Sequence, residues 1–195
     1  MEITTETIKA LRDKTGVSIM QCKKALEEAG GDFDQALVIL QKKSGATAEK
    51  KSDRDLGAGT IASYLHAGGS VGALVEIACE TDFVARNEDF QKFAYDIAMH
   101  VAAMNPLFLS VDEVGESDKA AALEVFKKEV EDKPADMQEK ILEGKMNSYL
   151  QDKVLLTQTY IKDSSLSVDD LVKAAVQKFG ENVRIIRYAR FSVGS

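Results

Sequence analysis

The sequence predicts an α+β fold: an N-terminal unit of three helices, followed by a three-stranded antiparallel sheet that is packed with helices and carries a helical hairpin. Two observations lead to this prediction. Alanine, lysine, glutamate and leucine are abundant and the 195 residues include only two prolines, a composition that favours helices over most of the chain. Three stretches, 60–66, 71–79 and 183–191, instead alternate their side chains with the period of two that is typical of strands.

The composition also limits the class of protein. A chain of 195 residues can build one medium domain, or a small and a larger domain, with a real core. Cys22 and Cys79 lie far apart, and there is neither a secretory segment nor an apolar run approaching the ~18 residues of a membrane helix, which predicts a reduced, soluble, cytoplasmic protein. A net charge of -7 argues against nucleic acid as a partner, because counterion release requires clustered Lys and Arg. We therefore expect a protein partner, without binding to nucleic acid or membrane.

Residues 1–45 are expected to form three short helices separated by glycines. Ser18 and Asp32 stand where the second and third helices should begin, each followed three residues later by glutamine, as in a capping box. Ser44–Gly45 is expected to close the third helix. Residues 46–56 have no sustained apolar stripe, which predicts a solvated helical linker and a domain boundary.

Residues 57–195 are expected to form the second domain, an α+β core. It opens with two antiparallel strands joined by a glycine-containing turn, and a long helix from about Glu88 to Met104 follows. The second strand, 71–79, should bury alternate side chains against this helix. The side chains expected on the buried face are those of Val71, Ala73, Val75 and Ile77.

The second half of this domain is expected to hold a helical hairpin and a final strand. Two charged helices at 118–132 and 135–151 are separated by Lys133–Pro134, which predicts an antiparallel helical hairpin at about 118–151. A helix that Ser167 caps then leads to the final strand, 183–191. This strand carries apolar side chains on both faces, which predicts that both faces are covered.

No arrangement of residues predicts an enzyme. The two histidines, His66 and His100, and the two cysteines lack the spacing of metal ligands, and no Walker A sequence or nucleophile elbow is present. His100 lies between apolar positions of the long helix and Cys79 lies in a strand, which favours structural roles for both. A hydrolase built on Cys79 and His66 would need a pocket that stabilises a thiolate, and the sequence offers none. We expect no covalent catalysis, no cofactor and no metal site.

The junction between the second strand and the long helix is the most informative segment for predicting function. Residues 81–86 form a polar connector that contains Phe83, and Asn87 can cap the helix that follows. Packed elements hold both ends of the connector, so it can present an aromatic side chain at little extra entropic cost. Phe83 could instead fold back over the edge of the sheet, and it is the resemblance of residues 79–86 to a known signature that places the ring at the surface.

Two strings of residues resemble the bacterial elongation factor Ts family. Residues 79–86, Cys-Glu-Thr-Asp-Phe-Val-Ala-Arg, closely resemble the signature of that family. Residues 11–26, Leu-Arg-Asp-Lys-Thr-Gly-Val-Ser-Ile-Met-Gln-Cys-Lys-Lys-Ala-Leu, resemble its N-terminal signature. The similarity runs from the first helix to the final strand. Long members carry two copies of the hairpin-plus-helix unit, whereas this chain has one and resembles the short form.

The resemblance implies a guanine-nucleotide exchange factor for elongation factor Tu, which promotes GDP release during translation elongation by disturbing the Mg²⁺ and phosphate site. It also implies a ubiquitin-associated-type fold for residues 1–45. An alternative is a ubiquitin-associated-like protein-binding adaptor without exchange activity, for which residues 1–45 would suffice. The residues implied for exchange are Thr81, Asp82, Phe83 and Val84, and those implied for partner binding are Arg12, Ile19, Met20, Lys23 and His66.

The final strand raises a question about oligomeric state. The periodicity places Ile185 and Ala189 on one apolar face of the final strand, and a single sheet would leave an apolar face exposed. The helical hairpin could fold back over that face. Alternatively, two chains could pair their sheets in a symmetric homodimer. Because the chain has a single copy of the core unit, we favour the homodimer.

Overall fold

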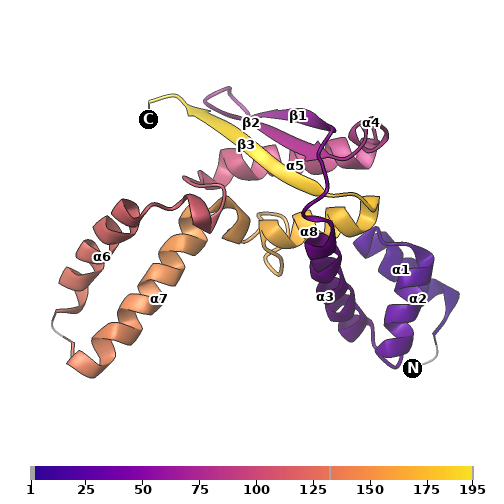
Figure 1. Cartoon of the computed structure of the whole chain (residues 1–195), viewed down its shortest axis with the longest axis horizontal. Coiled ribbons are helices and arrows are strands. Elements are labelled where there is room, and N and C mark those ends of the chain that lie inside the picture. The colour runs from indigo at the N-terminus through magenta and orange to yellow at the C-terminus, as the bar shows by residue number, and fades with distance from the viewer. Residues whose placement is uncertain (1–2, 132, 195) are drawn as a thin grey trace.

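The computed structural model describes residues 3–131 and 133–194. A three-stranded sheet lies on one side of the molecule, a long helix packs against it, and two helical units extend away from the sheet in different directions (Figure 1). This is the α+β class that the sequence predicts.

Within the described ranges, no helix has both the length and the apolar character needed to cross a bilayer. The helices are α1 (Thr5–Thr15), α2 (Ile19–Glu28), α3 (Phe33–Lys51), α4 (Asp82–Ala85), α5 (Glu88–Met104), η1 (Val111–Glu113), α6 (Glu116–Val130), α7 (Ala135–Lys153), η2 (Leu155–Thr157) and α8 (Val168–Phe179), and the strands are β1 (Ala58–Leu65), β2 (Val71–Cys79) and β3 (Val183–Ser192).

Helices α1 to α3 enclose a hydrophobic cluster of their own. The predicted N-caps of α2 and α3 are present, because the Ser18 hydroxyl and the Asp32 carboxylate each accept a hydrogen bond from the backbone N–H three residues later. Gly16 ends α1 with a φ of 68°, a left-handed conformation that favours glycine. The buried members of this cluster are Leu11, Val17, Cys22, Ala25, Leu26, Ala29, Ala36 and Leu40.

The sequence predicted that α3 ends at Ser44–Gly45, but the helix continues to Lys51. The buried Ser44 hydroxyl donates to the carbonyl of Gln41 at 2.6 Å, so this polar group is satisfied inside the helix. Glycine in a helix costs only about 1 kcal/mol relative to alanine, and α3 packs along α8 with Ala48 against the main core. Residues 46–51 are therefore helical, as predicted, but they continue α3; Ala46, Glu49 and Lys50 are exposed, whereas Thr47 and Ala48 are half-buried. The division of the chain into two domains near this point stays a prediction.

The sheet has the order β1-β2-β3, and both pairs of strands are antiparallel. Ala73, Val75 and Ile77 are buried on the face that α5 covers, as the alternation predicted, whereas Val71 is only half-buried. Helix α8 packs beside β3 and completes this layer. The side chains of α5 that are buried in the main core are Phe90, Ala94, Ile97, Ala98, Val101 and Ala102.

A β-bulge decides which residues of β3 face the helices. Ile77 pairs with Ile185 while the residue before Ile77 pairs with Arg187, so Ile186 is an extra residue in β3. The alternation inverts there: Ile185 is 6% exposed in the main core, whereas Ala189 is exposed on the other face. The prediction that Ile185 and Ala189 share a face is wrong, because it assumed an unbroken period of two.

The face of the sheet opposite α5, named here the open sheet face, carries exposed apolar side chains. The predicted helical hairpin is present as α6 and α7, held by an edge-to-face contact between Phe126 and Tyr149 and by an ion pair of 2.6 Å between Lys145 and Glu129. This hairpin extends away from the sheet (Figure 1), so the alternative in which it folds back over the sheet is wrong. The exposed apolar residues of the open sheet face are Ile61, Leu65, Leu74, Ile186 and Phe191.

A buried polar pair lies beside α5. His100 and Gln158 are 0% and 1% exposed. The Nε2 atom of His100 lies 2.9 Å from Oε1 of Gln158, and the backbone N–H of Ile161 donates to Nδ1 of His100 at 3.4 Å. These partners fit the neutral ring with its hydrogen on Nε2, and burial lowers the pKa of His100 below its usual 6.5. The histidine therefore has the structural role that the sequence favoured.

This arrangement predicts that stability falls as the pH decreases from about 7.5 to about 5.5, because the unfolded chain binds a proton at His100 that the folded chain does not. Each pH unit below about 6.5 should remove up to about 1.4 kcal/mol of the free energy of unfolding, until the pH reaches the lowered pKa of His100 in the folded chain. Urea unfolding across this range would measure it. The variant His100→Gln keeps His66 and should lose this dependence; equal slopes in both proteins would contradict the prediction.

Candidate functional site

The junction between β2 and α5 contains a single helical turn, where the sequence predicted only a connector. The Thr81 hydroxyl oxygen accepts a hydrogen bond from the backbone N–H of Val84 at 3.4 Å and so caps α4. Asn87 then caps α5 by accepting a hydrogen bond from the N–H of Asp89, as predicted. Residues 81–86, named here the α4 turn, therefore begin at the N-cap of α4 and end next to the N-cap of α5.

Phe83 projects from the α4 turn into solvent. Its side chain is 81% exposed, whereas the neighbouring Val84 and Ala85 are 5% and 8% exposed. Both neighbours belong to the main hydrophobic cluster together with Cys79. Successive side chains in a helix point about 100° apart, so burial of these two residues directs the Phe83 ring outward. The predicted surface position of Phe83 is confirmed, and Val84, which the resemblance places in the same segment, anchors the turn from inside.

Asp82 and Arg86 form the polar part of the same surface. Their side chains lie 3.0 Å apart across one helical turn and are 72% and 81% exposed. An ion pair this exposed contributes only about 0–1 kcal/mol. Either side chain can therefore turn to a binding partner at little cost in stability.

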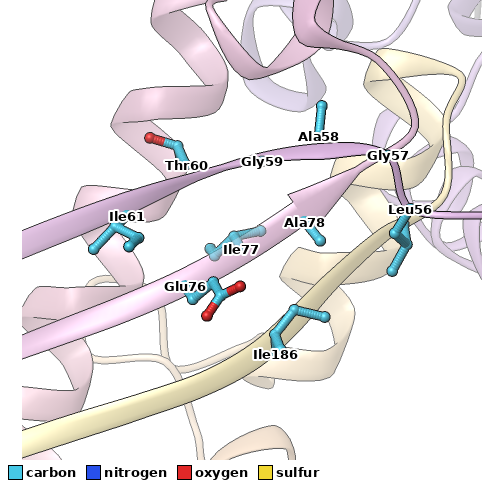
Figure 2. Close-up of a pocket in the computed structure, with 10 residues that line it drawn as sticks. All are labelled: Leu56, Gly57, Ala58, Gly59, Thr60, Ile61, Glu76, Ile77, Ala78 and Ile186. Atoms are coloured by element: carbon cyan, nitrogen blue, oxygen red, sulfur yellow. The ribbon is translucent and has the colours of Figure 1, made fainter.

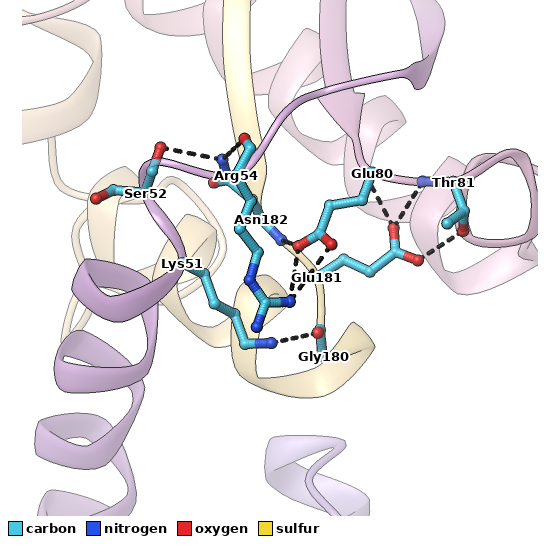
Figure 3. A network of polar contacts seen from close by, with 8 residues as sticks. All are labelled: Lys51, Ser52, Arg54, Glu80, Thr81, Gly180, Glu181 and Asn182. Carbon is cyan, nitrogen blue, oxygen red and sulfur yellow. Dashed lines mark hydrogen bonds and ion pairs between the residues drawn. The ribbon is translucent and has the colours of Figure 1, made fainter.

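The turn between α8 and β3 supplies polar contacts to the α4 turn (Figure 3). The Glu181 carboxylate accepts hydrogen bonds from the backbone N–H groups of Glu80 and Thr81, both at 3.0 Å, and from the Thr81 hydroxyl at 2.6 Å. The backbone N–H of Asn182 donates to the Glu80 carboxylate, which also lies 3.4 Å from the Arg54 guanidinium. The Asn182 hydrogen bond, more than Arg54, holds the pKa of Glu80 below its usual value. Sequence reasoning missed Glu181 and Asn182, because no local pattern connects them to a turn 100 residues earlier.

Cys79 and His66 do not form a reactive pair. Cys79 pairs with the first residue of β1, whereas His66 follows the last, so they lie at opposite ends of the two strands. The buried Cys79 Sγ donates to the carbonyl of Thr81 at 3.2 Å, and burial raises the pKa of its thiol. The hydrolase alternative is therefore contradicted. In the described parts of the chain, no group of three His, Cys, Asp or Glu side chains is placed to hold a metal ion.

The remaining residues that the resemblance singled out are exposed but lie in two places. Ile19 and Met20 are 55% and 64% exposed at the start of α2, next to the exposed Lys23, and Arg12 is exposed on α1. The α1–α2 unit and α4 lie at the same end of the molecule (Figure 1). His66 is exposed at the other end of the sheet, so the structure does not bring it together with the α4 turn.

A family model and individual relatives of the same name match this sequence. The sequence model of the family described as Elongation factor TS matches residues 50–195. The elongation factor Ts of Thermotoga petrophila is 45% identical over 194 residues, which cover 100% of this chain and 98% of the relative. The elongation factor Ts of Herpetosiphon aurantiacus is 45% identical over 197 residues, covering 100% of both chains. The chloroplastic elongation factor Ts of Rhodomonas salina is 47% identical over 197 residues, covering 99% of this chain and 90% of the relative.

The two neighbours Phe83 and Val84 should respond in opposite ways to truncation. Val84→Ala should lower the free energy of unfolding by about 1–3 kcal/mol, because it removes buried methyl groups. Phe83→Ala should change it by less than about 0.5 kcal/mol, because the ring is exposed. Urea unfolding of both variants measures the difference. A large loss of stability in Phe83→Ala would show that the ring packs in the core.

Proposed function

Because the chain belongs to the elongation factor Ts family, we propose that it acts as a guanine-nucleotide exchange factor for elongation factor Tu during translation elongation. The observation that carries this proposal is Phe83, which an anchored helical turn holds 81% exposed. An apolar side chain that is already fixed in position can enter a partner without a large loss of conformational freedom. The factor acts by binding and needs no covalent step.

Thr81, Asp82, Phe83 and Val84 form the exchange segment. Mg²⁺ neutralises and orients the phosphates of a bound nucleotide, so displacing the groups around it removes part of the binding energy of GDP. Phe83 enters near the switch region of elongation factor Tu as an apolar wedge. Asp82, released from Arg86, accepts hydrogen bonds from backbone N–H groups that the displacement exposes. Val84 holds the segment in the core of the factor.

Exchange by this route follows from thermodynamic linkage. If the factor lowers the affinity of elongation factor Tu for GDP, then GDP lowers the affinity for the factor by the same ratio. The bound factor therefore promotes nucleotide release, and a returning nucleotide promotes release of the factor.

The α1–α3 unit is the docking unit in this proposal, with a ubiquitin-associated-type fold. The exposed apolar pair Ile19 and Met20 is flanked by Arg12 and Lys23, and interfaces are rich in methionine and arginine. These residues grip a helix of elongation factor Tu away from its nucleotide, and His66 makes a separate contact. Membership of the family does not favour the alternative of an adaptor without exchange activity. A cytoplasmic location, and the absence of binding to nucleic acid or membrane, stay predictions.

Two chains pair through the open sheet face in this proposal. Ile61, Leu65 and Phe191 are at least 67% exposed there, and a contiguous apolar surface of this kind marks an interaction site. A second copy offers a face of matching chemistry across a two-fold axis. At one end of the face, Leu56, Ile61 and Ile186 line a shallow depression that can receive side chains from the partner (Figure 2).

Phe83→Ala should lower the stimulated release of GDP from elongation factor Tu at least about tenfold. The ring would be buried in the complex, and truncating an aromatic side chain that is buried in an interface typically costs about 2 kcal/mol or more. Release of a fluorescent GDP analogue measures the rate. Leu107→Ala, which truncates an exposed apolar side chain outside the α4 turn, should keep the full rate. An unchanged rate in Phe83→Ala would remove Phe83 from the mechanism.

Ala189→Asp should convert the proposed homodimer to single chains, because the symmetric interface would bury the new charge twice beside Leu74. Light scattering should give about twice the mass of one chain for the natural sequence and about one chain mass for the variant. Val125→Asp also replaces an exposed apolar residue, on α6, and should stay dimeric. A natural sequence that is monomeric at tens of micromolar would contradict the pairing.

A further inference from the structure

We propose that Glu181 and Asn182 are positioning residues for nucleotide exchange, an inference that rests on the proposed function. Glu181 fixes the orientation of the α4 turn, and Asn182 fixes the chain segment that leaves the docking unit. Both belong to one short connection, residues 180–182 between α8 and β3 (Figure 3). This connection therefore sets the position of the exchange segment relative to the docking unit.

Glu181 supplies order that the α4 turn cannot supply for itself. A helix of four residues is far below the length at which helices are stable in water. One carboxylate accepts hydrogen bonds from the N–H groups of Glu80 and Thr81 and from the Thr81 hydroxyl. That hydroxyl in turn accepts the N–H of Val84. Glu181 thus orients the cap residue, and the cap residue orients the backbone that carries Phe83.

Asn182 connects the same turn to the docking unit. Its side chain is 3% exposed, and Nδ2 donates to the carbonyl of Arg54 at 2.9 Å and to that of Ser52 at 3.3 Å. Its backbone N–H donates to the Glu80 carboxylate. The ammonium of Lys51, the last residue of α3, donates to the carbonyl of Gly180. The end of α3 and the segment that follows it are therefore bound to Gly180 and Asn182, which flank the Glu181 that holds the α4 turn.

The charges around this turn are balanced. Glu80 and Glu181 bring two carboxylates close to each other, and both bind the neighbouring backbone N–H groups. The guanidinium of Arg54, in the segment after α3, lies 3.4 Å from the Glu80 carboxylate, and the ammonium of Lys51, at the end of α3, adds positive charge near it. Opening this segment would separate the Glu80 carboxylate from these cations, which favours the closed arrangement.

The two residues should affect exchange in different ways. Loss of Glu181 leaves docking intact but lets the α4 turn fluctuate, so it should reduce the rate of release once the complex has formed. Loss of the Asn182 side chain releases the segment after α3 while α3 stays packed along α8, so binding at one surface presents the other at a lower effective concentration. That loss should raise the concentration of factor needed for half of the maximal rate.

The test measures release of a fluorescent GDP analogue from elongation factor Tu over a range of factor concentrations. Glu181→Ala should lower the maximal rate about tenfold and change the half-saturating concentration less than about twofold. Glu181→Gln should restore most of the rate, because its amide oxygen can accept both N–H groups. Asn182→Ala should raise the half-saturating concentration about tenfold with little change in the maximal rate.

Two further measurements separate positioning from general stability. Glu113→Ala removes a carboxylate that also accepts a backbone N–H, from Leu109, and should leave both kinetic parameters unchanged. Amide hydrogen exchange of residues 80–86 in the free factor should be faster in Glu181→Ala than in the natural sequence or in Glu181→Gln.

The outcomes distinguish this inference from the function on which it rests. If the natural sequence does not stimulate release at all, the proposed function fails, and hydrogen exchange still decides whether Glu181 orders the turn. If the natural sequence is active but Glu181→Ala keeps the full maximal rate, or Glu181→Gln is as slow as Glu181→Ala, positioning by Glu181 is overturned. Equal effects of Asn182→Ala and Glu113→Ala would overturn the role of Asn182.

Discussion

The packing of α5 against one face of the sheet is the contact on which the candidate site depends. Each large side chain buried there, such as Phe90 or Ile97, contributes about 1.5–3 kcal/mol, far more than the exposed ion pair of Asp82 with Arg86. This layer fixes the end of β2 and the start of α5, so the connection between them has little freedom. With Val84 turned into the core, Phe83 can only point outward.

Local rules were sufficient for much of the fold, and they failed where tertiary contacts outweigh them. Ser18, Asp32 and Asn87 begin helices as predicted, because a cap is a contact between residues only two or three positions apart. Gly45 does not end α3, because packing of that helix along α8 outweighs the weak helix propensity of one glycine. The face of Ile185 was assigned wrongly, because the prediction assumed an unbroken period of two, whereas a bulge in the pairing with β2 inserts Ile186.

The candidate site shows the same division. The exposed position of Phe83 could be predicted, because residues 79–86 resemble the family signature, whereas the junction alone left a position over the sheet edge open. The contacts of Glu181 and Asn182 could not, because they depend on how β3 aligns with β2. A single sequence contains no signal for which carboxylate will meet a distant backbone. The residues that present Phe83 are thus harder to find than Phe83 itself.

The order in which a ribosome makes the chain gives this topology a further consequence. The hydrogen bond from Asn182 to Glu80 joins residues that are 102 positions apart, a length that takes on the order of 5–20 s to translate. Until then, one edge of β2 has no partner strand and the α4 turn lacks the carboxylate that orders it. In the proposed exchange role, a nascent chain therefore carries Phe83 on a turn that Glu181 does not yet hold. The segment proposed to release nucleotide thus takes its final shape only once residues 180–182 have been made.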